Sequence, residues 1–188
     1  DRKDTACRIA AFSLYLAMLD QLRPSDIREL YGKGKVLPPL VYDPAKTSAT
    51  REGKTIIRAD FFAEEADVPL EAFDVVVGNP PWASLSGPKV PAELWCDSHS
   101  LEIANRQLAQ AFIWKAPHHL KPKSRVCFVL PHSVLFNQQA KAVKFQRDWL
   151  KRHTVDSILN LTDFQRFLFD AEGPAIVVRY AKEAPEDG

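Results

Sequence analysis

Four consecutive residues, Asn79-Pro80-Pro81-Trp82, combine groups that could bind an amine and a flat ring, and they follow the apolar run FDVVVG at 73–78. Prolines fix φ and lack a backbone N–H, so this stretch offers carbonyl oxygens and the Asn79 amide oxygen as acceptors. The Trp82 indole adds an apolar face for stacking. The combination favours a site for a planar molecule that carries an amino group. A simple strand-ending turn is the structural alternative.

Methyl transfer to an exocyclic amine is the chemistry that matches these groups. The lone pair of such an amine is delocalised into its ring, which makes the nitrogen a weak nucleophile. Two acceptors, the Asn79 amide and the Pro80 carbonyl, can draw the amine hydrogens out of the ring plane and direct the lone pair at a methyl donor. This mechanism depends on positioning and electrostatics, and it requires no strong base.

The elements that must position this motif alternate along the chain. Apolar runs predict strands at 55–58, 73–78, 125–131, 154–161 and 175–182. Helical patterns cover 4–22, 101–119 and 137–152, and residues 31–53 and 84–98 have the composition of loops. This order predicts an α/β fold with a mainly parallel sheet. Ligands of such sheets bind beyond the carboxyl ends of the strands, which is where Asn79 is expected.

The composition is that of a globular domain: 46% of the 188 residues are hydrophobic and 26% are charged. No apolar run reaches the roughly 18 residues of a membrane span, and no secretory signal is recognisable, so we expect no membrane association. The three cysteines fit a reducing, cytoplasmic setting better than a disulfide framework. Cys96 and His99 lack a second ligand pair at suitable spacing, so no metal site is predicted.

The net charge of +1 is unevenly distributed. Nine cations between residues 115 and 152 are opposed only by Asp148, namely Lys115, Lys121, Lys123, Arg125, Lys141, Lys144, Arg147, Lys151 and Arg152. They indicate either a solvated helix face or a surface that meets phosphates. The near-neutral total predicts that the main duplex-binding surface lies outside this chain.

The motif and its strand resemble those of the S-adenosylmethionine-dependent DNA adenine-N6 methyltransferases of restriction–modification systems. The fourth motif of that family is Asp/Asn-Pro-Pro-aromatic after an apolar strand, here FDVVVGNPPW. Its third motif is an acid followed by an aromatic, here RADFF, which implies that Asp60 accepts from the cofactor's adenine amine while Phe61 packs on that ring. The second motif places an acid five residues before Ala6, which implies that Asp1 binds the ribose hydroxyls.

Later segments extend the resemblance over nearly the whole chain. RVCFVLPHSVLFN looks like the fifth strand and its loop, FQRDWLKRHTVDSILNL like the basic helix and sixth strand, and GPAIVVRYAK like the seventh strand. In the family, an aromatic near the seventh strand covers the second face of the flipped base. Tyr180 is the candidate, and Phe164, Phe167 and Phe169 are its rivals. The resemblance implies a partial Rossmann-like methyltransferase fold: a mainly parallel sheet, helices on both faces, and an antiparallel last strand.

Two features depart from the family pattern. Trp82 replaces the commoner Tyr or Phe, and the glycine-rich first motif, which cradles the methionine part of the cofactor, is absent. The family's first two strands lie between its third and fourth strands. We therefore expect residues 1–188 to be the C-terminal part of a catalytic domain without its upstream cofactor-binding strands. Alone, this segment should bind S-adenosylmethionine weakly or not at all.

The resemblance implies methyl transfer from S-adenosylmethionine to the N6 amine of an adenine rotated out of double-stranded DNA, within a restriction–modification or similar defence system. The partners would be DNA and the upstream and target-recognition regions, carried by the same protein or by a partner subunit. Two alternatives remain open at this point. One is methylation of protein glutamine amides or RNA guanine amines, and the other is a non-catalytic nucleic-acid-binding or assembly module with a degenerate methyltransferase fold.

Overall fold

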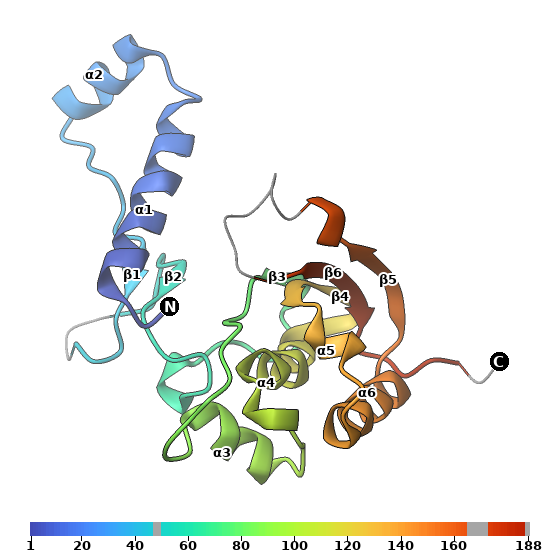
Figure 1. The fold of residues 1–188 in the computed structure, drawn as a ribbon. Coiled ribbons are helices and arrows are strands. Elements are labelled where there is room, and N and C mark those ends of the chain that lie inside the picture. The colour runs from blue at the N-terminus through green and yellow to red at the C-terminus, as the bar shows by residue number, and fades with distance from the viewer. Residues whose placement is uncertain (47–49, 165–172, 187–188) are drawn as a thin grey trace. The chain divides into compact units, whose positions relative to one another are not determined.

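A computed structural model describes residues 1–46, 50–164 and 173–186 (Figure 1). The chain divides into two compact units, Asp1–Val68 and Pro69–Gly188. None of the helices in these described ranges is long and apolar enough to cross a membrane.

The first unit consists of two helices and a short parallel strand pair. Helix α1 (Asp4–Leu19) confirms the predicted N-terminal helix, and α2 (Pro24–Gly32) follows it. Proline is favoured at the first position of a helix because the N–H that it lacks would have no intrahelical acceptor there. Strand β1 (Val41–Tyr42) pairs with β2 (Ile56–Ile57), and the 3-10 turn η1 (Glu64–Ala66) comes later.

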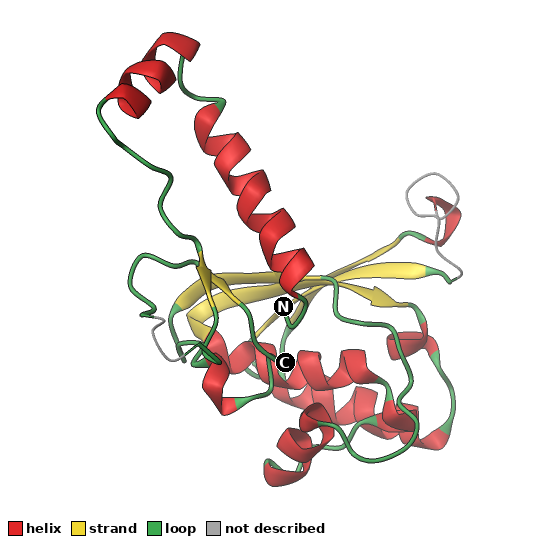
Figure 2. Cartoon of the chain, turned by 90° about the vertical axis from the view of Figure 1, so that its left-hand side faces the viewer, coloured by secondary structure: helices red, strands yellow, loops and turns green. Residues whose placement is uncertain are grey.

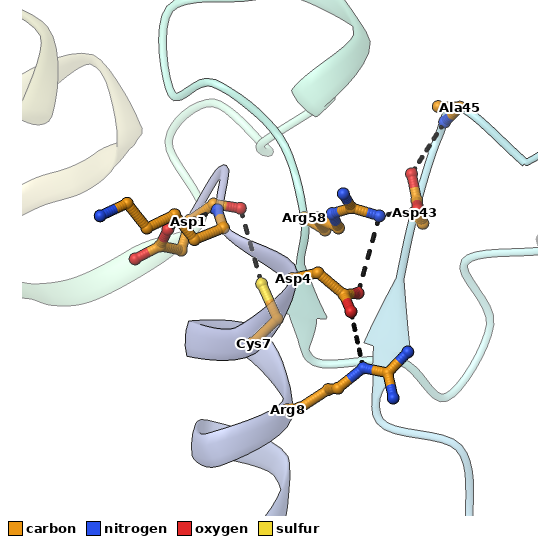
Figure 3. A network of polar contacts seen from close by, with 8 residues as sticks. Asp1, Asp4, Cys7, Arg8, Asp43, Ala45 and Arg58 are labelled. Atoms are coloured by element: carbon orange, nitrogen blue, oxygen red, sulfur yellow. Dashed lines mark hydrogen bonds and ion pairs between the residues drawn. The ribbon is translucent and has the colours of Figure 1, made fainter.

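A charged network ties the start of α1 to both strands of this unit (Figure 3). The Arg58 guanidinium, just after β2, donates to Asp43 at 2.8 Å and lies 3.6 Å from Asp4. Asp43, just after β1, is only 8% exposed, so its carboxylate needs this partner. Arg8 also binds Asp4, at 2.6 Å within α1. The network therefore fixes the N-terminus of α1 beside the ends of β1 and β2.

The second unit is built on a four-stranded sheet. Its strands are β3 (Phe73–Gly78), β4 (Leu120–Pro131), β5 (Val155–Asn160) and β6 (Ala175–Ala181). Its helices are α3 (Pro91–Ser98), α4 (Leu108–Lys115), α5 (Ser133–Phe136) and α6 (Ala140–Arg152), with 3-10 turns η2 (Ala104–Arg106), η3 (Ala116–His119) and η4 (Thr162–Phe164). The strand order is β3-β4-β6-β5; β3 and β4 are parallel, and β6 is antiparallel to both of its neighbours. The predicted α/β fold with an antiparallel last strand is confirmed.

The described helices of this unit lie on one face of the sheet (Figure 2). The prediction placed helices on both faces. Both crossovers, β3 to β4 and β4 to β5, run in the same direction across the sheet, and right-handed crossovers in one direction place their helices on one side. On the other face Val75, Val77 and Leu159 are 57%, 72% and 59% exposed.

Three segments differ from their predicted secondary structure. Residues 31–53, predicted as a loop, contain the end of α2 and the short strand β1. The 84–98 stretch, predicted as a loop, contains α3, which begins at Pro91; the Glu93 carboxylate accepts the Val90 N–H at 3.1 Å and so caps the start of the helix. The helix predicted over 101–119 is broken, because Asn105 and Arg106 have φ of 51° and 53°. This left-handed conformation cannot continue a right-handed helix, so α4 starts only at Leu108.

The core of this unit is centred on Tyr180 of β6, which is fully buried. Its hydroxyl donates to the Ile113 carbonyl at 2.9 Å, and its ring lies edge-on to Trp149 with 5.2 Å between centroids. The residue four positions after Ile113 is Pro117, which has no N–H to offer that carbonyl. Tyr180 therefore satisfies an acceptor that the helix cannot, and burial raises the pKa of its hydroxyl well above the ordinary value.

We expect Tyr180→Phe to lower the free energy of unfolding by about 1–2 kcal/mol, because the buried Ile113 carbonyl loses its donor. Denaturant unfolding of the chain measures this change. Tyr31→Phe is the matched control, because Tyr31 is 80% exposed, and its effect should stay within about 0.5 kcal/mol. Equal stability of Tyr180→Phe and the wild type would contradict the assigned role of the hydroxyl.

Candidate functional site

Strand β3 carries the Asn-Pro-Pro-Trp motif to the edge of the sheet. Its parallel register with β4 ends at the Gly78–Phe128 pair. A Cβ atom at Gly78 would lie 3.2 Å from a carbon of the Phe128 ring, so glycine permits this close approach. Because β4 ends at the same edge, Asn79 lies beyond the carboxyl end of a parallel pair, as the sequence predicted.

The motif is held together by a bond between its first and last residues. The Trp82 indole N–H donates to the Asn79 amide oxygen at 3.0 Å. Asn79 and Pro81 are exposed, Trp82 is half-buried, and Pro80 is buried. Neither the indole nor the amide is withdrawn into the interior. An amide oxygen can accept two hydrogen bonds, so that of Asn79 keeps capacity for a second donor.

The chain that leaves the motif is anchored to the segment before α4. Leu85 donates its backbone N–H to the Arg106 carbonyl at 3.0 Å, and Leu108 donates to the Ala83 carbonyl at 3.0 Å. Ser84 and Gln107 form the antiparallel bridge between these two bonds. Residues 83–85 therefore follow a fixed path directly after Trp82.

The same segment also reaches the loop after β4. The Gln107 side chain donates to the Ser133 hydroxyl at 3.1 Å and accepts from Gln110 at 3.1 Å. Gln110 is 1% exposed, and its amide oxygen accepts the Ala104 N–H at 2.6 Å. Thus the segments after β3, before α4 and after β4 are joined at one edge of the sheet. Sequence reasoning missed Gln107 and Gln110, because both occur in a stretch that reads as ordinary helix.

The predicted cofactor residues Asp60 and Phe61 lie in the first unit, after β2. The Asp60 carboxylate accepts the Phe62 N–H at 2.9 Å and lies 3.4 Å from the Arg2 guanidinium. It stays partly accessible, with 21% of its side chain exposed. Phe61 is half-buried and lies edge-on to Phe62, with 5.4 Å between ring centroids. Asp60 thus caps the turn after β2 and also keeps a partly open carboxylate.

The third predicted cofactor residue, Asp1, lies near Asp60. The backbone nitrogen of Asp1 donates to the Ile57 carbonyl at 3.0 Å, and its carboxylate accepts the Lys3 N–H at 2.8 Å. Its carbonyl accepts from the Cys7 thiol at 3.5 Å (Figure 3). The structure therefore brings Asp1 to the carboxyl end of β2, where Asp60 and Phe61 follow.

The base-stacking role expected for Tyr180 does not fit its position. The ring belongs to the core described above, on the helix-covered face, and none of its surface is exposed. A residue that stacks on a flipped base must present a ring face to a cleft. Of the rival aromatics, Phe167 and Phe169 lie outside the described residues, as does the side chain of Phe164.

The cations of α6 follow an amphipathic pattern. Lys141, Lys144 and Lys151 are exposed, whereas Phe145 and Trp149 are buried on the other side of the helix. Lys144 is already paired with a carboxylate, 2.7 Å away in Glu102. The pattern is compatible with both predicted roles of these cations, a solvated helix face and a surface that meets phosphates.

The contacts of Cys96 and His99 are those of residues that pack within the fold. Burial raises the pKa of the Cys96 thiol to about 12, so it stays protonated at neutral pH. His99 stacks on Trp95 with 4.1 Å between ring centroids. Among the residues that the structure describes, no group of three or more His, Cys, Asp or Glu side chains is arranged to hold a metal ion.

The hydrogen bond between Trp82 and Asn79 can be tested without an enzyme assay. Asn79→Ala removes the acceptor, so the Trp82 indole N–H should exchange faster with solvent and its resonance should move. Nuclear magnetic resonance of the indole N–H groups measures both changes. Asn137→Ala is the control, because Asn137 accepts from the Gln139 N–H instead. An unchanged Trp82 signal in Asn79→Ala would show that the two side chains are not bonded in solution.

Comparison with known proteins agrees with the fold. The model of the Eco57I restriction-modification methylase family matches residues 1–167. The type I restriction enzyme EcoKI M protein aligns with a TM-score of 0.50 and 20% identity over 69% of this chain and 25% of its own. A putative class I S-adenosylmethionine-dependent methyltransferase from Listeria monocytogenes aligns with a TM-score of 0.53 and 16% identity over 100% of this chain and 62% of its own.

These structural likenesses show a shared fold, and the chain spans about a quarter and three fifths of the two structures' lengths. A search of curated protein sequences gives no match. The family match covers most of the chain, including both predicted cofactor motifs and the Asn-Pro-Pro-Trp motif. The chain belongs to the Eco57I restriction-modification methylase family.

Proposed function

We propose that this chain forms part of a DNA methyltransferase that transfers a methyl group from S-adenosylmethionine to the N6 amine of adenine, within a restriction–modification system. The observation that carries the proposal is the exposed Asn79 amide, which lies beyond the carboxyl end of β3 and is bonded to Trp82 at 3.0 Å. Family membership over residues 1–167 supports the substrate class.

In this proposal the target adenine leaves the duplex and binds beyond the carboxyl end of β3. Its N6 amine donates to the Asn79 amide oxygen and the Pro80 carbonyl, which polarise the nitrogen toward the methyl donor. The half-buried Trp82 ring supplies the stacking surface. S-adenosylhomocysteine would leave as the second product, and the methylated nitrogen would lose its extra proton to water. No side chain is then needed as a strong base, which agrees with a motif of one amide, two prolines and an indole.

The cofactor would be held by residues of the first unit. Asp60 would accept from the adenine amine of S-adenosylmethionine, Phe61 would pack on that ring, and Asp1 would accept from the ribose hydroxyls. These residues fit the group, because the Asp60 carboxylate is partly exposed and Phe61 lies beside it, only half-buried. The bound cofactor supplies an electrophilic methyl group.

The rest of the cofactor site and the target-recognition surface are proposed to lie outside residues 1–188, in the same protein or in a partner subunit. In the described residues β2 pairs with β1 and β3 pairs with β4, so the third and fourth family strands occur in separate sheets. The second edge of β3 has no strand partner in that part of the chain. Both observations are expected if further strands complete the sheet.

Tritiated methyl transfer from S-adenosylmethionine by the complete protein tests the substrate. Duplex DNA, structured RNA and a glutamine-containing release-factor protein are compared as acceptors. Label on adenine N6 of DNA supports the proposal, and label on RNA or protein alone overturns it. Absence of transfer to any of them would support a non-catalytic module instead.

Asn79→Ala in the complete protein should abolish methyl transfer, because the amine loses an acceptor that polarises it. Affinity for S-adenosylmethionine should change by less than about tenfold, since the cofactor contacts lie elsewhere and a neutral amide contributes little to a ligand it does not touch. Asn79→Asp keeps an acceptor oxygen in place and should retain part of the activity. Kinetics and calorimetric titration measure the two effects. Full turnover by Asn79→Ala would mean that the amine is bound by other groups.

A further inference from the structure

One ion pair holds the loop that follows the Asn-Pro-Pro-Trp motif. The Arg106 guanidinium binds both carboxylate oxygens of Glu93, at 2.7 and 2.8 Å. It also donates to the Gly87 carbonyl at 2.9 Å and to the Pro88 carbonyl at 3.2 Å. Four hydrogen bonds from a single side chain thus connect the loop, the first turn of α3 and the segment before α4.

Glu93 is suited to such a role by its burial. It is 6% exposed, and its carboxylate also accepts the Val90 N–H at 3.1 Å. Hydrogen bonds from Arg106 hold the pKa of Glu93 below its usual range, so the carboxylate is charged at neutral pH. A buried carboxylate requires a compensating cation, and the planar guanidinium matches it with two parallel bonds.

The backbone of the same arginine anchors the loop at its other end. The Arg106 carbonyl accepts the Leu85 N–H at 3.0 Å, and Leu108 binds Ala83 at 3.0 Å. The positive φ of Arg106, 53°, marks a turn at this residue. Side chain and backbone together therefore fix the path from Ala83, next to Trp82, to Val90, the residue before α3.

We propose that Arg106 and Glu93 form a positioning pair for the Asn79–Trp82 motif. Neither residue needs to touch the substrate. They hold residues 83–90 so that the indole of Trp82 and the amide bonded to it meet an incoming base in the productive orientation. This inference rests on the proposed function, because it assigns the pair a part in the same methyl transfer.

The experiment compares Glu93→Gln, Arg106→Lys and the double variant in the complete protein. Lysine keeps the charge but cannot form the fork, and glutamine keeps the shape but not the charge. We expect each single variant to lower kcat by roughly 10- to 100-fold through misplacement of the motif. The KM for S-adenosylmethionine should change by less than about threefold, and the double variant should be no worse than the poorer single one, as expected for coupled residues.

Glu102→Gln is the matched control. It also removes a carboxylate from an ion pair, but Glu102 and its partner Lys144 are 68% and 57% exposed, and this pair makes no hydrogen bond to residues 83–90. Its kcat should equal that of the wild type. Thermal unfolding of every variant gives the folded fraction at the assay temperature, which separates loss of fold from loss of positioning.

The outcomes distinguish this inference from the proposed function. If the wild type transfers no methyl group to DNA, the proposed function fails. If the wild type is active, the inference is overturned by an unchanged kcat in both single variants, by losses that only follow the folded fraction, or by additive losses in the double variant. A coupled loss of kcat in fully folded variants, with KM for the cofactor retained, supports it.

Discussion

The parallel pairing of β3 with β4 is the constraint on which the candidate site depends. It brings the carboxyl ends of two strands to one edge, so that the residues after Gly78 and those after Pro131 lie at that edge. The bond from Gln107 to Ser133 joins the following loops only because of this alignment. Gly78 allows the final pair to close, since a side chain there would press on the Phe128 ring. The position of Asn79 thus follows from sheet packing.

The ion pairs of the second unit differ greatly in burial, and therefore in how strongly they can restrain a loop. Lys121–Asp74 and Lys144–Glu102 join side chains that are 46% to 78% exposed, and such surface pairs contribute about 0–1 kcal/mol. The carboxylate of Glu93 is almost fully buried, so its partner cannot be lost without leaving a buried charge. Together with the backbone hydrogen bonds of Leu85 and Leu108, a pair of the second kind can set the path of a loop that contains little regular structure.

Sequence patterns placed the central motif correctly because strand and turn signals agree there. The apolar run at 73–78 and two prolines define a strand end with little ambiguity. Helix α3 could in principle have been predicted from the sequence, because Pro91 and Glu93 form a helix start signal. Nearby prolines, however, gave the segment a loop-like composition. The packing role of Tyr180 could not be predicted from the sequence. A continuous apolar strand does not show which of its two faces is packed, and β6 turns this ring toward α4.

The Arg106–Glu93 pair could not be predicted from the sequence either. Its residues are 13 positions apart and meet because Asn105 and Arg106 adopt a left-handed conformation that neither residue type requires. Periodicity favours a helix through this stretch, and the helix would turn the guanidinium elsewhere. The tertiary contacts that override this local preference, with Gly87, Pro88 and Glu93, all come from the loop and helix after the motif. These contacts cannot be read from sequence patterns, and they also connect the pair to the Asn79–Trp82 motif.

The Trp82–Asn79 hydrogen bond couples the orientation of the indole to that of the amide. A neutral hydrogen bond of this kind contributes about 0.5–1.5 kcal/mol, which is enough to orient an exposed amide. The bond uses one acceptor site of the amide oxygen and leaves the other for a second donor. Because the ring edge is bonded to the amide, the direction of the ring face is set relative to the amide plane. In the proposed reaction, a base that stacks on this face is thereby oriented with respect to the oxygen that must accept its amine.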